Sequence, residues 1–141
     1  MKTKYVFFGI VCLLAASRAI AQSTLEVTVK NIREAKGSVR IALFTNEQDF
    51  LKKAAHAKVV DATGKEIKVV FEGLTPGVYG VSVFHDANGN GTLDKNLMGM
   101  PTEGFAFGNN AMGMFGPPSF EKAQVTVGPG ASSHVIDLKY M

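Results

Sequence analysis

Short runs in which apolar and polar side chains alternate dominate residues 25–85, and turn-forming residues interrupt them. In the first run Leu25, Val27 and Val29 are separated by single polar residues. Successive side chains of a strand point to opposite faces, so this period of two indicates a strand with one buried face. Repetition of the pattern along the chain predicts an all-β fold with little helix.

The expected strands cover residues 25–30, 38–45, 58–62, 65–72, 78–85, 122–127 and 133–140. The third and fourth are predicted to form a hairpin around Thr63-Gly64. About seven short strands with turn signals between them are typical of an antiparallel β-sandwich.

Residues 46–57 break the alternation and are predicted to include a short helix with Asn46 as its N-cap. In the strand after the Pro-Gly turn, Tyr79, Val81, Val83 and His85 fall on one face. We expect Val81 and Val83 to be buried and the Tyr79 phenol to reach a backbone partner.

A loop rich in oxygen-bearing side chains follows this strand. Asp86, Asn88, Asn90 and Asp94 occupy the first, third, fifth and ninth positions of a D-x-N-x-N-G-x-x-D pattern, with Gly91 at the sixth. Hard cations such as Ca²⁺ take carboxylate, amide and carbonyl oxygens, and a calcium loop turns sharply at its sixth position. The spacing therefore predicts a weak calcium site at these four residues.

The pattern departs from an EF-hand. Leu97 stands where a bidentate Glu belongs, and a strand precedes the loop where an EF-hand has a helix. Glu103 can supply a further carboxylate if the chain folds back. A plain turn is the alternative, because Asn, Asp and Gly also favour turns closed by side-chain to backbone bonds.

The first 21 residues have the features of an export signal. Lys2 and Lys4 precede an apolar run over residues 6–16, and Ala19-Ile20-Ala21 is a small-x-small cleavage site. The run is short for a membrane span. We expect cleavage after Ala21, no lipid on Cys12, and a periplasmic or extracellular mature domain over residues 22–141.

Cleavage would change the charge balance of the chain. The whole chain carries 15 Lys+Arg against 12 Asp+Glu, and Lys2, Lys4 and Arg18 lie in the signal. The remaining basic and acidic residues are equal in number, which gives no support for nucleic-acid binding. The mature length suits one domain.

Residues 88–120 contain no convincing element but many Gly, Asn, Met and Phe residues. A structureless loop of this length is usually functional or disordered, and its apolar content argues against disorder. We expect an ordered loop that packs on the sandwich. Its apolar residues are a possible ligand or partner surface, or alternatively a lid over the core: Phe105, Phe107, Met112, Met114 and Phe115.

Catalytic patterns are missing from the sequence. It contains no G-x-S-x-G, no H-E-x-x-H and no cysteine after Cys12. His85 and Asp86 are strand neighbours and point to opposite faces, so they do not make a simple dyad. His56 and His134 show no metal-ligand spacing. The sequence predicts a protein that is not an enzyme.

Several segments together resemble a family of small exported bacterial proteins, domain of unknown function 2141. The resemblance is carried by LTPGVY at 74–79, HDANGNGTLD at 85–94, GMPTEGFAF at 99–107, NNA at 109–111 and PSFE at 118–121. It implies an immunoglobulin-like or prealbumin-like sandwich after a signal peptide, and no established activity. The turn at 76–79 and the Asn-Gly segment also resemble calcium-binding B-type repeats of bacterial surface proteins.

These observations predict an exported, non-enzymatic β-sandwich that serves as a binding or accessory module of the periplasm or envelope. Its partner is an unknown protein or small ligand, and calcium is the expected cofactor. A purely structural or interaction domain whose Asn/Gly loop binds no metal is the alternative, and an uncharacterised enzyme is a third.

Overall fold

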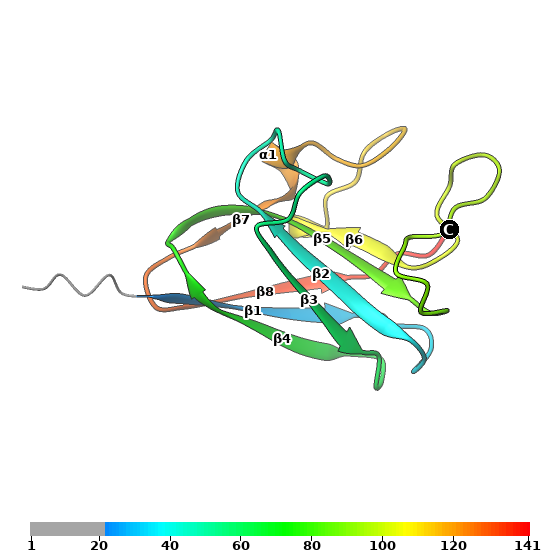
Figure 1. Cartoon of the computed structure of the whole chain (residues 1–141), viewed down its shortest axis with the longest axis horizontal. Coiled ribbons are helices and arrows are strands. Elements are labelled where there is room, and N and C mark those ends of the chain that lie inside the picture. The colour runs from blue at the N-terminus through cyan, green and yellow to red at the C-terminus, as the bar shows by residue number, and fades with distance from the viewer. Residues whose placement is uncertain (1–21) are drawn as a thin grey trace, which may run out of the picture.

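Two β-sheets pack face to face in the computed structural model, which describes residues 22–141 (Figure 1). The predicted signal segment lies outside these residues. The strands are β1 (Ser23–Lys30), β2 (Ser38–Phe44), β3 (His56–Asp61), β4 (Ile67–Leu74), β5 (Gly77–Asp86), β6 (Phe105–Phe107), β7 (Gln124–Val127) and β8 (Ala131–Asp137). A 3₁₀ turn, η1 (Gly108–Asn110), and one helical turn, α1 (Phe120–Ala123), complete the elements.

The smaller sheet has the strand order β4-β1-β8, and the larger has β3-β2-β5-β6 with β7 also paired to β5. The predicted all-β sandwich is confirmed. Eight described strands replace the expected seven, and β1 and β8 pair in parallel whereas the other pairs are antiparallel. The parallel pair arises because the chain crosses between sheets after β7, so that β8 enters beside β1 in the same direction.

The predicted hairpin around Thr63-Gly64 is wrong, because β3 and β4 lie in different sheets. His56 of β3 pairs with Leu43 of β2, whereas Ile67 of β4 pairs with Val29 of β1. The chain does reverse here, but it crosses from one layer to the other. Turn residues signal a reversal and carry no information about which sheet receives the next strand.

The predicted short helix within residues 46–57 is also wrong. Asn46 makes the expected cap contact, since its Oδ1 accepts from the Asp49 N–H at 2.8 Å. Consecutive turns follow, and no helix forms. Leu51 has a φ of 60°, a left-handed conformation that ends the helical path.

Side chains from both sheets form the central core. The inward face of β5 is as predicted, with Val81 and Val83 buried, and the inward face of β4 buries Ile67, Val69 and Phe71. The core also includes Leu25, Val27, Val29, Ile41, Leu43, Leu74, Ile136 and Leu138. The Tyr79 hydroxyl donates to the Thr75 carbonyl at 2.6 Å, which confirms the expected backbone partner.

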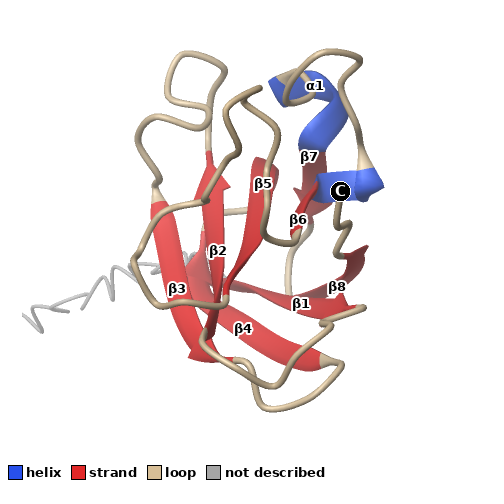
Figure 2. Cartoon of the chain, turned by 90° about the vertical axis from the view of Figure 1, so that its right-hand side faces the viewer, coloured by secondary structure: helices blue, strands red, loops and turns tan. Residues whose placement is uncertain are grey.

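A second apolar cluster covers the outer face of the larger sheet. It contains Phe44, Phe50, Phe105, Phe107 and Ala123, with Phe84 and Phe120 packed against it. Gly80 faces this cluster, and a Cβ there would lie 2.7 Å from the Phe120 ring. The turns after β2 and the segment around α1, seen together at the top of Figure 2, therefore pack on a sheet that is apolar on both faces.

Candidate functional site

The segment of residues 87–104 leaves the end of β5 and returns beside it. The His85 N–H donates to the Gly104 carbonyl at 2.7 Å, which closes the base of the segment. Farther out, Lys95 and Pro101 form a bridge, and the Thr102 N–H donates to the Asp94 carbonyl at 2.9 Å. We call this segment the first loop; it projects at the right of Figure 1.

Asp86 anchors the base of the first loop from a buried position. Its carboxylate accepts from Arg40 Nε at 3.0 Å, from the Gly91 N–H at 2.9 Å and from the Asn90 N–H at 3.1 Å. Burial alone would raise the pKa of Asp86. The bonds from Gly91 and Arg40, with the Arg40 charge, outweigh burial and hold this pKa below its usual range.

Glu103 joins the two limbs of the first loop and is only 8% exposed. Its Oε1 accepts from the Ala87 N–H at 3.2 Å, and its Oε2 accepts from the Asp94 N–H at 3.1 Å. The chain thus folds back as the calcium hypothesis requires, but this carboxylate is bonded to backbone donors.

The four predicted metal ligands divide into two groups. The Asp94 carboxylate accepts from the side-chain amides of Asn88 and Asn90, so these three residues come together. The Asp86 carboxylate lies at the base, where it is paired with Arg40 and accepts from the backbone N–H of Asn90. Within residues 22–141 no group of three or more His, Cys, Asp or Glu side chains is placed to hold a metal ion. Calcium binding through amide and carbonyl oxygens stays a prediction.

The tip of the first loop is a tight turn with exposed apolar side chains. The Asn96 Oδ1 accepts from the N–H groups of Met98 at 2.9 Å and Met100 at 3.0 Å, and Gly99 has a φ of 78°. Leu97 is fully exposed and Met98 is 84% exposed. The hydrogen bonds fix the backbone while these side chains point into solvent.

Residues 111–119, which we call the second loop, connect η1 to α1. Met112 is exposed, Met114 is 92% exposed and Phe115 is fully exposed. Phe105 and Phe107 are only 7% and 9% exposed, because β6 carries them into the outer apolar cluster. These two residues of the predicted partner surface therefore belong to the protein interior, and the other three lie on the surface.

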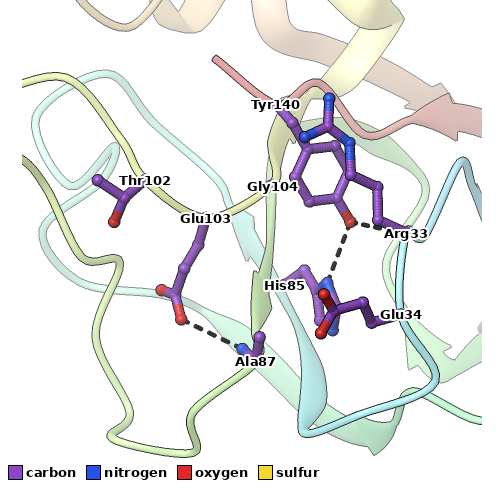
Figure 3. Close-up of a pocket in the computed structure, with 8 residues that line it drawn as sticks. All are labelled: Arg33, Glu34, His85, Ala87, Thr102, Glu103, Gly104 and Tyr140. Atoms are coloured by element: carbon purple, nitrogen blue, oxygen red, sulfur yellow. Dashed lines mark hydrogen bonds between the residues drawn. The ribbon is translucent and has the colours of Figure 1, made fainter.

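A small cavity of about 170 Å³ lies beside the base of the first loop (Figure 3). His85 Nε2 contacts the Lys36 carbonyl at 2.7 Å, which makes Nε2 the protonated nitrogen, and Nδ1 contacts the Tyr140 hydroxyl at 3.0 Å. The Arg33 N–H donates to the same hydroxyl at 3.0 Å. The two ring nitrogens of His85 thus contact the segment before β2, through Lys36, and the C-terminal segment, through Tyr140.

The Tyr140 ring fills one wall of this cavity. The Arg33 guanidinium lies 4.2 Å from the ring centre, and a Cβ on Gly104 would lie 2.5 Å from a ring carbon. Burial raises the pKa of Tyr140, the Arg33 N–H and charge oppose that shift, and Glu34 adds to it. The Tyr140 hydroxyl can donate to His85 Nδ1 while it accepts from the Arg33 N–H, so the hydroxyl and both ring nitrogens have partners.

Sequence reasoning missed the partners of Asp86 and His85. Arg40 and Tyr140 lie 46 and 55 residues away along the chain. Arg40 stands at an outward position of its strand, and that is the only local signal. Asn96 also escaped notice, although Asn two residues before the first methionine is a common turn-forming arrangement.

The fold and the loop define a class: a small all-β sandwich domain whose elaborated segment follows the strand β5. A family model described as "Uncharacterized protein conserved in bacteria (DUF2141)" matches residues 27–135, and the chain belongs to this family. Comparisons with curated proteins and with solved structures gave no match.

Proposed function

We propose that this protein is an exported, non-enzymatic binding domain of the bacterial envelope that presents its two loops to a protein partner. One observation carries the proposal. Each loop has anchored ends and exposes large apolar side chains to solvent. These side chains are Leu97 and Met98 on the first loop and Met114 and Phe115 on the second.

The energetics favour a partner. Full burial of a side chain such as Leu97 or Phe115 stabilises an interface by about 1.5–3 kcal/mol. Exposed apolar groups gathered on a surface are typical of interaction sites. Because hydrogen bonds already order the turn before Met98 and Met100, less conformational entropy is lost on binding than for a flexible loop.

Two observations support the wider context. The export features of residues 1–21 are typical of a cleaved signal, and the chain belongs to a bacterial family. No helix among residues 22–141 has the length and apolar character needed to cross a membrane.

The non-enzymatic assignment rests on how the titratable groups are used. Asp86 is bonded to Arg40 and to two backbone N–H groups, and both ring nitrogens of His85 have partners. Each group completes a structural contact, and among the described residues neither is bonded to a Ser, Thr or Cys side chain.

Photo-crosslinking in the native bacterium tests the proposal. A photoreactive phenylalanine replaces Phe115, and in a matched strain it replaces Val135, which is exposed on β8 of the other sheet. We expect a discrete crosslinked protein of higher mass from position 115 and not from position 135. No adduct at 115, or the same adducts at both positions, would overturn the proposal.

Weak calcium binding by the first loop is a second candidate, favoured by the convergence of Asn88, Asn90 and Asp94. Rotation of the two amides would turn their oxygens toward the Asp94 carboxylate, an arrangement that requires a cation. Calcium should raise the melting temperature of wild type and of the exposed control Asp61→Ala, but not of Asp94→Ala. Wild type without a response at about 10 mM Ca²⁺, ten times the weak end of extracellular sites, would rule calcium out.

A further inference from the structure

Methionine is distributed unevenly in this chain. Apart from the initiator Met1 and the C-terminal Met141, every methionine lies in one of two Met-Gly-Met motifs, at residues 98–100 and 112–114. One motif occupies each loop of the candidate site. The chain has no cysteine after Cys12, so methionine thioethers are the sulfur ligands of the mature domain, and all of them except Met141 lie in the two motifs.

The first motif sits on a fixed turn. The Asn96 side chain accepts from both methionine N–H groups, and the Asn96 N–H donates to the Met100 carbonyl at 2.8 Å. The Gly99 N–H donates to the Asn96 carbonyl at 2.9 Å. Four hydrogen bonds to one asparagine thus order the backbone on both sides of Gly99 and leave the two side chains exposed.

The second motif is held by close backbone packing. A Cβ on Gly113 would lie 2.1 Å from the Gly116 carbonyl oxygen and 2.7 Å from that of Pro117. Glycine is therefore required between Met112 and Met114, as the positive φ of Gly99 favours it in the first motif. Both motifs place two exposed thioether side chains on either side of a glycine.

We propose that the two Met-Gly-Met motifs bind Cu(I) through the thioethers of Met98, Met100, Met112 and Met114. Sulfur ligands such as methionine select soft ions, whereas oxygen ligands suit calcium and magnesium. A thioether has no proton to lose, so binding needs no deprotonation. The step is addition of sulfur lone pairs to the ion, without a change in oxidation state.

Two features favour a metal over a purely apolar role. Methionine usually serves as a flexible filler of buried gaps, but Met98 and Met114 stand in water. Leucine would provide the same apolar surface, as Leu97 does beside Met98. Both loops also project from the right-hand part of the molecule in Figure 1. The inference does not depend on the protein partner proposed above, because it requires sulfur and not apolar area.

Substitution by leucine separates the two proposals, since it keeps the apolar surface and removes sulfur. The test uses the mature protein under argon with ascorbate and Cu(I) held by the coloured chelator bicinchoninate. Five proteins are compared: wild type, the quadruple Met→Leu variant of the two motifs, the two double variants, and the control Met141→Leu, which changes an exposed methionine outside the motifs.

We expect wild type and Met141→Leu to withdraw Cu(I) from the chelator and to show copper–sulfur scattering in X-ray absorption. The quadruple variant should bind more than about tenfold more weakly, since even changes outside the ligand shell cost about 10–100-fold in metal affinity. Each double variant should bind more weakly than wild type. Thermal melts confirm that all variants are folded.

Three results would overturn the inference. They are a wild-type protein that leaves Cu(I) on the chelator, a folded quadruple variant that binds as wild type does, and scattering from oxygen or nitrogen alone. A double variant that binds as tightly as wild type would remove that loop from the site. If the quadruple variant loses Cu(I) binding but still crosslinks through position 115, Cu(I) binding and partner binding are separate functions of the loops.

Discussion

The two loops carry similar tips on different foundations. The first is built on buried carboxylates: Asp86 bonds to Arg40 and to the N–H groups of Asn90 and Gly91, and Glu103 bonds to its two limbs. The second stands on aromatic packing, where Phe120 meets Phe50 edge to face with ring centres 5.7 Å apart. Hydrogen bonds to carboxylates therefore position the loop of the first Met-Gly-Met motif, and aromatic packing positions the loop of the second.

Because of this difference, the stabilities of the two loops should respond to different changes. Charge-assisted hydrogen bonds depend on ionisation and therefore on pH. Apolar packing depends on buried area and volume and responds little to pH. Removal of an aromatic ring should therefore destabilise the second loop, and removal of a carboxylate charge should destabilise the first.

Loss of the Phe50 ring should have the largest effect. Phe50 is buried against Phe44, with ring centres 5.3 Å apart, and against Phe120. Phe50→Ala should lower the free energy of unfolding by about 3 kcal/mol in urea melts, since it leaves a cavity. The neighbouring exposed Leu51→Ala should cost far less. Equal losses would mean that the outer cluster supports little.

Neutralising Asp86 should cost about 2 kcal/mol at neutral pH, because Asp86→Asn weakens the bonds to Arg40 and leaves buried donors poorly matched. The exposed control Asp61→Asn should stay near wild type. Urea melts of all three proteins check this expectation. A loss in the control as large as that in Asp86→Asn would contradict it.

The same carboxylate should make stability depend on pH. The pKa of Asp86 is lowered in the folded protein, so its contribution is present above the unfolded value of about 3.9 and is lost as pH falls through the folded pKa. Wild type and Asp86→Asn should therefore converge in stability below about pH 4. A constant difference between them from pH 7 to the acid range would refute an ionised Asp86 in the fold.

A smaller loss is expected for Glu103→Gln, about 1 kcal/mol, because one amide oxygen replaces two carboxylate oxygens that accept from Ala87 and Asp94. Glu72→Gln on the exposed face of β4 is the matched control. Chemical denaturation measures the change in the free energy of unfolding. A Glu103→Gln variant as stable as wild type would mean that other contacts hold the limbs of the first loop.

The smallest effect should come from the tips themselves. Leu97→Ser and Phe115→Ser change side chains that stand fully in solvent, so each should alter stability by less than about 0.5 kcal/mol. Crosslinking through a neighbouring position should nevertheless fall if the tips bind a partner. A large stability loss in thermal melts would show that a tip is packed on the protein.

The sequence predicted the strands well because alternation reports burial directly. Val81 and Val83 faced the core as their spacing required. It did not predict which sheet receives β4, since that depends on pairing with β1, whose residues lie about 40 positions earlier. The sequence also did not show why residue 80 is a glycine, because only the folded chain brings the Phe120 ring over it.

The candidate site was predicted in position more than in chemistry. Spacing located the polar loop after β5, and Glu103 was named as a further carboxylate for the case in which the chain folds back. The partner of Asp86 was missed because Arg40 lies on the neighbouring strand β2, and local spacing does not show which strand pairs with β5. Phe105 and Phe107 were placed on the possible partner surface, and the short strand β6, which has no periodic signal of its own, carries them inward.

Amide hydrogen exchange in wild type and Asp86→Asn tests most directly whether carboxylates hold the first loop and apolar packing holds the second. At pH 7 the Asn90 and Gly91 amides should be protected in wild type and exchange much faster in the variant. The Ala111 amide at the start of the second loop, bonded to Gly108, should keep its protection in both. Unprotected Asn90 and Gly91 amides in wild type, or equal acceleration in both loops, would contradict separate foundations.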